Sequence, residues 1–162
     1  MTYTVAMVCL GNICRSPIAH VVLEDRLVKA GLDDQVAVVS SGTGGWHEGN
    51  PMDPRSADVL AQAGYDPSRH VARTFTTDWY AEYDLLLAMD HSNRSDMLDL
   101  APTVDQQHQV RLFREFDPEA TELDDEVPDP YYGGTDGFHH VLAMVERTVD
   151  QLVEQLPQLT RS

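Results

Sequence analysis

Short continuous runs of apolar residues alternate along this chain with segments in which apolar positions recur at helical spacing. The continuous runs predict buried β-strands at residues 4–9, 36–39, 83–89 and 110–113. The periodic segments predict helices at residues 17–30, 53–63, 92–100 and 137–156. A long acidic loop, residues 114–136, separates the last strand from the last helix. Continuously apolar strands are typical of parallel sheets that are covered on both faces.

Strands and helices follow one another in turn, and this order predicts an α/β fold: a four-stranded parallel sheet flanked by helices on both faces. A length of 162 residues fits one domain, so we expect residues 1–162 to form a single domain. Parallel sheets of this kind bind ligands beyond the carboxyl ends of their strands. The functional residues are therefore expected in the loops that follow the strands.

The charge of the chain narrows the range of partners. There are 27 acidic residues against 11 lysines and arginines, a formal net charge of −16. Nucleic acids and anionic membranes are bound through Lys and Arg, and Lys29 is the only lysine, so we expect neither as a partner. Residues 115–162 are the most acidic stretch, with twelve acidic and two basic residues. Residues 1–30, with three basic and two acidic residues, do not repel anions.

Targeting signals and cofactor ligands are not apparent. Arg15 interrupts the first apolar run, and no apolar run approaches the ~18 residues of a membrane span. The two cysteines, Cys9 and Cys14, are too few for a secreted disulfide scaffold, and no cluster around them has the spacing of zinc ligands. We therefore expect a cytoplasmic protein without a metal or other cofactor. No interface stripe stands out, so we expect a monomer.

The loop after the first strand, within residues 8–17 (VCLGNICRSP), has the features of an anion site. Ser16 is a suitable N-cap for the following helix, and Pro17 fits its first turn. The free N–H groups and the positive end of that helix then face the loop and favour an anion there. The guanidinium of Arg15 adds a planar fork that can bind two phosphate oxygens. The sequence thus predicts a phosphate-binding loop between the first strand and the first helix.

Cys9 stands at the start of this loop. It is followed by Gly11 and Asn12, which are residue types that tolerate a left-handed backbone. Such a backbone turns successive N–H groups inward around an oxyanion. Helix N-termini and cationic neighbours favour the thiolate of a cysteine, which is its nucleophilic form. A thiolate at the bottom of a phosphate cradle is placed to attack phosphorus in line.

The pattern C-x5-R-S-P after a first strand resembles the low-molecular-weight protein tyrosine phosphatases. This resemblance implies that Cys9 is a nucleophile that forms a phosphocysteine intermediate. It also implies that Ser16 donates a hydrogen bond to the Cys9 thiolate and makes it a better leaving group. The phosphate-binding residues implied by the resemblance are Leu10, Gly11, Asn12, Ile13, Cys14, Arg15 and Ser16.

A second motif, the segment D-P-Y-Y at residues 129–132, also resembles this family. Asp129 lies between two prolines, which stiffen the chain around it. The resemblance implies that Asp129 protonates the leaving phenol oxygen and then acts as a base toward the water that hydrolyses phosphocysteine. It further implies that Trp46, Tyr131 and Tyr132 form the walls of the crevice. A deep cradle between aromatic walls would favour phosphotyrosine over the shorter phosphoserine.

Three weaker matches concern support of the phosphate-binding loop. By the same resemblance, Ser41 and His70 are expected to hydrogen-bond Asn12 and to hold its strained backbone; Ser40 is an alternative to Ser41. Asp90 matches a further family segment, and we expect it to cap the following helix or to bond locally rather than to touch substrate.

Two other interpretations compete with a phosphatase that acts on tyrosine-phosphorylated proteins or peptides. Arsenate reductases of the same fold share the C-x5-R loop, but their resemblance implies two more cysteines in mid-chain. This chain has none after Cys14. The other interpretation is a non-catalytic phosphotyrosine-binding or redox-sensing module, against which the presence of both Cys9 and Asp129 argues. A disulfide between Cys9 and Cys14 under oxidation remains an open alternative that does not exclude phosphatase activity.

Overall fold

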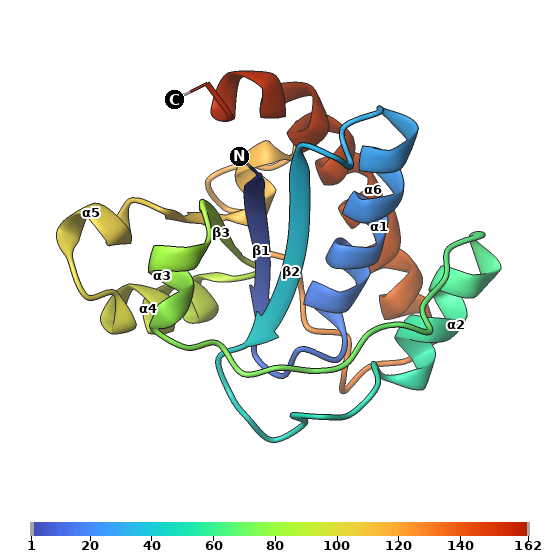
Figure 1. Cartoon of the computed structure of the whole chain (residues 1–162). Helices are drawn as coiled ribbons and strands as arrows, with labels where there is room; N and C mark the ends of the chain where they lie inside the picture. Colours follow the sequence, from blue (N-terminus) through green and yellow to red (C-terminus); the bar gives the residue numbers. More distant parts are fainter. Residues whose placement is uncertain (1, 162) are drawn as a thin grey trace.

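A computed structural model describes residues 2–161, and at its centre lies a parallel four-stranded sheet (Figure 1). The strands are β1 (Tyr3–Cys9), β2 (Val36–Gly42), β3 (Leu85–Ala88) and β4 (Val110–Leu112), in the order β2-β1-β3-β4. Cys9 pairs with Gly42, while Val8 pairs with Ala88, which in turn pairs with Leu112. The carboxyl ends of all four strands therefore meet at one edge, and the predicted parallel sheet is confirmed.

Helices cover both faces of the sheet, also as predicted (Figure 1). On one face lie α1 (Arg15–Lys29), α2 (Pro54–Gln62) and α6 (Thr135–Leu159); on the other lie α3 (Asp78–Glu82) and α4 (His91–Leu100). Strand β1 contributes side chains to the hydrophobic cores on both faces. Val5 and Met7 pack on the face of α1, α2 and α6, while Ala6 and Val8 pack on the face of α3 and α4. This alternation explains why β1 reads as continuously apolar.

Several boundaries differ from the prediction. Strand β2 continues to Gly42, and α1 begins at Arg15 instead of Pro17, with Cys14 as its N-cap. Two short helices, α3 and α5 (Val104–Gln107), lie in segments for which the sequence predicts no element. The 3₁₀ helix η1 (Phe113–Phe116) begins at the last residue of the predicted fourth strand and continues into the predicted acidic loop. Helix α6 continues through Pro157 to Leu159. Within residues 2–161, no helix combines the length and the apolar character needed to cross a membrane.

Candidate active site

The loop between β1 and α1 lies directly on the end of β2. A Cβ atom at Gly42 would stand 2.6 Å from the carbonyl oxygen of Leu10 and 2.9 Å from the carbonyl carbon of Gly11. Both neighbours are backbone atoms, so glycine is required for this close approach. The loop also receives hydrogen bonds from the segment that follows, since the N–H groups of Thr43 and Gly44 donate to the carbonyls of Cys9 and Leu10.

Asn12 carries the strained backbone of this loop. Its φ angle is 58°, and it is the only non-glycine residue with a positive φ in the described part of the chain. The ring Nε2 of His70 donates to the Asn12 carbonyl at 2.7 Å, as the sequence analysis expected. The backbone N–H of Arg73 donates to the Asn12 side-chain oxygen at 2.9 Å, while the side-chain nitrogen donates to the Ser16 hydroxyl at 2.8 Å. Asn12 is thus held at three atoms, which offsets the cost of its left-handed conformation.

The expected bond from the Ser41 side chain to Asn12 is not present. The hydroxyl of Ser41 is buried without a hydrogen-bond partner, and only its carbonyl takes part, accepting from the Ser16 hydroxyl at 3.4 Å. Strand β2 extends through this residue, so its side chains alternate between the two faces. It is therefore Ser40 whose side chain lies toward α1, where it bonds the ring Nδ1 of His20 at 3.0 Å.

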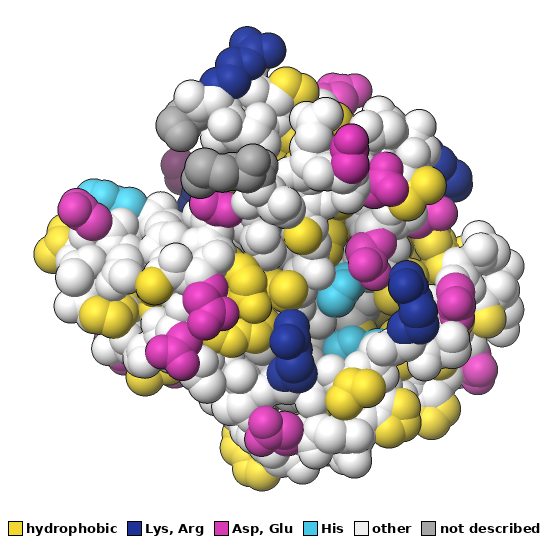
Figure 2. All heavy atoms as spheres, in the orientation of Figure 1, with side chains coloured by type: hydrophobic (Ala, Val, Ile, Leu, Met, Phe, Trp, Pro, Cys, Tyr) yellow, Lys and Arg dark blue, Asp and Glu magenta, His cyan; other side chains and the backbone are white. Residues whose placement is uncertain are grey.

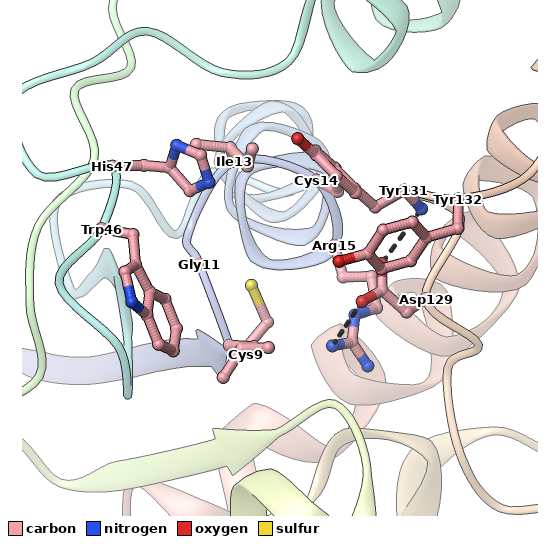
Figure 3. A pocket seen from close by; sticks show the side chains of 11 residues that line it. Cys9, Gly11, Ile13, Cys14, Arg15, Trp46, His47, Asp129, Tyr131 and Tyr132 are labelled. Atoms are coloured by element: carbon pink, nitrogen blue, oxygen red, sulfur yellow. Dashed lines mark hydrogen bonds and ion pairs between the residues drawn. The ribbon is translucent and has the colours of Figure 1, made fainter.

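The sulfur of Cys9 points into a hollow above the loop (Figure 3). It is 3.0 Å from the Ser16 hydroxyl and accepts the backbone N–H of Asn12 at 3.3 Å. Ser16 thus contacts the sulfur from within the first turn of α1, although it does not cap that helix as expected. The Asn12 N–H and the N-terminus of α1, the positive end of the helix dipole, thus both lie beside this sulfur.

Arg15 is buried beside this sulfur, with 3% of its side chain exposed. One of its nitrogens, Nη1, lies 2.6 Å from a carboxylate oxygen of Asp90 and also donates to the carbonyl of Val127 at 3.0 Å. Burial alone would lower the pKa of Arg15, but the charges of Cys9 and Asp90 outweigh it, so the pKa is raised. Arg15 is therefore a fixed cation at the floor of the hollow.

Asp90 has two roles in the structure. Its Oδ1 accepts the N–H of Asn93 at 2.7 Å and caps α4, as the sequence analysis expected. Its Oδ2 forms the ion pair with Arg15, a contact that could not be assigned from the sequence because the two residues are 75 positions apart. Asp90 thus orients the guanidinium from behind and does not line the hollow.

The hollow itself has a volume of about 300 Å³. It is lined by Cys9, Leu10, Gly11, Ile13, Cys14, Arg15, Trp46, His47, Asp129, Tyr131 and Tyr132. Trp46 stands on one side of the sulfur and Tyr131 and Tyr132 on the other, so the three predicted wall residues are brought together (Figure 3). His47 was not predicted; it lies outside both sequence motifs and approaches the ring of Tyr131 at a centroid distance of 6.5 Å.

Asp129 reaches the hollow from the long loop before α6. Its Oδ2 lies 3.8 Å from Nη2 of Arg15, and its Oδ1 accepts the backbone N–H of Tyr131 at 3.1 Å. Because 38% of its side chain is exposed, water can reach this carboxyl. A sulfur and a guanidinium from the loop between β1 and α1, and a carboxyl group from a distant loop, thus face one cavity.

Cys14, the second cysteine of the loop, also lines the hollow, and both cysteines are free thiols in this structure. Burial, reinforced by the charges of Asp53, Cys9 and Asp129, raises the pKa of the Cys14 thiol to about 12. Cys14 therefore keeps its proton at neutral pH and is not a competing nucleophile. Across residues 2–161, no group of three or more His, Cys, Asp or Glu side chains is arranged to hold a metal ion.

The fold and this cavity together define a class: small α/β proteins that hold a cysteine and an arginine in the loop after the first strand, near a carboxyl group and between aromatic walls. Comparison with protein families makes the assignment specific, since residues 4–161 match the family described as Low molecular weight phosphotyrosine protein phosphatase. The chain belongs to this family. The predicted tyrosine phosphatase function is thereby supported over the arsenate reductase alternative.

Named relatives agree with this assignment. The chain is 49% identical over 146 residues to a low molecular weight protein-tyrosine-phosphatase of Streptomyces coelicolor, covering 90% of this chain and 88% of the relative. It is 40% identical over 148 residues to the low molecular weight protein-tyrosine phosphatase A of Mycobacterium tuberculosis, covering 91% and 88%. Among solved structures, a protein tyrosine phosphatase from Entamoeba histolytica superposes with a TM-score of 0.91 at 32% identity, over 97% of this chain and 98% of that one.

Proposed function

We propose that this protein hydrolyses the phosphate ester of phosphotyrosine, and of small aryl phosphates, through a cysteinyl-phosphate intermediate. The observation that carries the proposal is the arrangement in one cavity of the Cys9 sulfur, the buried Arg15 guanidinium and the Asp129 carboxyl group. A single domain comprising residues 1–162 would supply every group that the reaction needs.

In the first step, the Cys9 thiolate attacks phosphorus, and the bond from phosphorus to the phenol oxygen breaks. Asp129 gives its proton to the departing oxygen, so that a neutral phenol leaves. Arg15 and the N–H groups of the loop bind the three remaining phosphoryl oxygens, where negative charge gathers in the transition state. The Asp90 carboxylate, which holds Arg15 at 2.6 Å, keeps the guanidinium in place throughout.

In the second step, Asp129, now ionised, takes a proton from a water molecule, which attacks phosphorus from the side that the phenol has left. The bond from sulfur to phosphorus breaks, and inorganic phosphate and the thiolate are released. The contact of 3.0 Å between the Ser16 hydroxyl and the Cys9 sulfur supports a stabilising role for Ser16 as negative charge returns to sulfur. The enzyme ends in the form in which it began, with no metal or other cofactor consumed.

The walls of the cavity support an aryl substrate. Trp46 is 72% exposed and Tyr132 is 91% exposed, so both aromatic faces are available at the mouth. A phenyl ring between them lets the phosphoryl group reach the sulfur at the bottom, and stacking of rings contributes ~0.5–1.5 kcal/mol beyond area burial. Phosphoserine has no ring to bind these walls and is too short to reach the sulfur from them. Tyrosine-phosphorylated proteins or peptides are therefore the proposed partners.

The test is hydrolysis of phenyl phosphate in the presence of a chelator by the wild type, Cys9→Ser and Asp129→Ala. Asp99→Ala, which removes an exposed carboxylate on α4, serves as the matched control. We expect no turnover by Cys9→Ser, a loss of ~10²–10⁴ in kcat/KM for Asp129→Ala, and wild-type rates for the control. Acid-quenched wild type should carry phosphate on Cys9 in mass spectrometry. Activity retained by Cys9→Ser would overturn the mechanism.

A further inference from the structure

Residues 128–134, here called the acid loop, carry the carboxyl of Asp129 and the aromatic walls of the cavity. Just before the loop, Val127 is anchored twice: its N–H donates to the carbonyl of Met89 at 2.8 Å, and its carbonyl accepts from Arg15. After Val127, about seven residues remain before α6 begins at Thr135. A contact in the second half of the loop is needed to fix where its side chains lie.

Arg55, in the first turn of α2, makes such a contact. Its Nη2 donates to the carbonyl of Tyr131 at 2.9 Å, and its Nη1 donates to the carbonyl of Gly133 at 3.1 Å. The guanidinium also lies over the ring of Phe138 in α6, 4.5 Å from its centroid, and 5.6 Å from the centroid of Tyr131. One guanidinium therefore binds the acid loop through two backbone carbonyls and an aromatic face.

Arg55 is itself held by Asp53, the N-cap of α2. Nε of Arg55 donates to Oδ1 of Asp53 at 3.1 Å, and Nη2 donates to Oδ2 at 3.0 Å, a bidentate pair. Only 8% of Asp53 is exposed, and its own N–H donates to the carbonyl of Ile13 at 2.9 Å. A chain of direct hydrogen bonds thus runs from the phosphate-binding loop at Ile13, through Asp53 and Arg55, to the acid loop.

We propose that Arg55 is a positioning residue, which bridges the phosphate-binding loop to the acid loop and thereby sets where Asp129 stands relative to the phosphoryl group. This inference rests on the proposed function, because it assumes that Asp129 is the proton donor. Arg55 touches no reacting atom. It acts through the backbone of Tyr131, whose N–H is bonded to the Asp129 carboxylate.

A misplaced proton donor has a specific kinetic signature. The p-nitrophenolate ion leaves readily without a proton, whereas the phenol of phenyl phosphate, with a pKa near ~10, needs protonation as it departs. Displacement of a catalytic group by about 1 Å can cost ~10²-fold in rate. Loss of Arg55 should therefore slow phenyl phosphate much more than p-nitrophenyl phosphate. A general loosening of the fold would slow both substrates alike.

The experiment measures kcat/KM for both substrates with the wild type, Arg55→Ala and Arg55→Lys. Arg69→Ala is the matched control, because it removes an arginine charge that is 77% exposed and paired with Glu24, away from the cavity. We expect Arg55→Ala to lose ~10–100-fold on phenyl phosphate, less than ~5-fold on p-nitrophenyl phosphate, and the control to lose nothing. Arg55→Lys keeps the charge but lacks the fork, so it should behave like Arg55→Ala. If Arg55→Ala unfolds below the assay temperature, the lysine variant gives the same test.

Equal losses on the two substrates, or full activity of Arg55→Lys, would overturn the bridge. A double-mutant cycle with Asp129→Ala closes the test: in that background Arg55→Ala should no longer discriminate between the two substrates. Continued discrimination there would mean that Arg55 acts elsewhere. Failure of this inference is distinguishable from failure of the proposed function, because the Cys9→Ser and Asp129→Ala single variants report on the latter alone.

Discussion

Asp117 makes the stability of this fold depend on pH in a way that can be calculated. Its carboxylate is buried between two arginines: Nε of Arg114 lies 2.8 Å from Oδ2, and Nε of Arg147 lies 2.8 Å from Oδ1. The N–H of Glu119 donates to the same group at 2.9 Å. Burial by itself would raise the pKa of Asp117, but the bonds from Arg147, Glu119 and Arg114 outweigh it and lower the pKa from 3.8 to about 2.

A carboxyl whose pKa is lower in the folded than in the unfolded chain stabilises the fold above the unfolded pKa, and this stabilisation is lost as pH falls through the folded pKa. The shift of nearly two units corresponds to about 2 kcal/mol of unfolding free energy at neutral pH. The titration curves imply that roughly half is lost by about pH 3 and most of it by about pH 2. Acid should therefore weaken the packing of η1 against α6, where Asp117 joins the two elements.

The assay is urea unfolding of the wild type and Asp117→Asn at about pH 7 and about pH 3, followed by circular dichroism. The wild type should lose about 1 kcal/mol more than Asp117→Asn between the two conditions, because the amide has no proton to gain. Asp99→Asn, which neutralises an exposed carboxylate, should follow the wild type. If wild type and Asp117→Asn lose stability in parallel, the ion pairs of Asp117 do not hold its pKa down and the reasoning is wrong.

Three further outcomes are expected. Asp90→Ala leaves the buried Arg15 charge without its carboxylate, so the free energy of unfolding measured in urea should fall by ~3–5 kcal/mol. A fall of less than about 1 kcal/mol would mean that water or another group replaces Asp90. Gly42→Ala places a methyl group against the backbone of the proposed phosphate-binding loop. Because this displaces the loop, kcat/KM for p-nitrophenyl phosphate should fall ~10²-fold. A wild-type rate would show that the loop can shift without affecting the reaction. Raising the salt concentration should increase kcat/KM for phosphopeptides with acidic flanking residues, or lower it less than for peptides with basic ones, because salt screens the net charge of −16. A steep loss of kcat/KM confined to acidic peptides would contradict this.

The sheet, and the loop that brings Cys9 and Arg15 to one cavity, could be predicted from sequence because their signals are local. A buried parallel strand is a continuous apolar run, and the residues from Cys9 to Ser16 are contiguous in the chain. The short helices α3 and α5 could not be found in this way. They contain five and four residues, too few for a 3.6-residue period to be visible. The sequence predicts that α1 begins two residues later than it does, because proline favours the first helical position but is also accommodated at the third, where its missing N–H has no partner within the helix.

The hydrogen bonds that hold the site in place could not be predicted from sequence where they join segments that are distant in the chain. The partner of Arg15 is 75 positions away at Asp90, and Arg55 lies 76 positions before Tyr131. No composition or periodicity relates such pairs; only the meeting of strand ends at one edge of the sheet brings them together. The predicted bond from Ser41 to Asn12 is wrong for a related reason. Its neighbour Ser40 has the same side chain, and the alternation of side chains along β2 places Ser40, like Val36 and Val38, on the face covered by α1.

The charge of −16 and a phosphate-binding cavity are compatible because they act over different distances. Arg15 is buried at the cavity floor, where Asp90, 2.6 Å away and outside the hollow, holds its guanidinium in place. In the proposed reaction, attraction for a phosphoryl group comes from this guanidinium, the N–H groups of the loop and the positive end of α1, which act within a few ångströms. The acidic side chains at the surface, shown for one face of the molecule in Figure 2, are screened beyond ~8 Å at physiological salt. We therefore expect the surface to influence how fast a phosphopeptide arrives, and the loop and the aromatic walls to determine how tightly it is held.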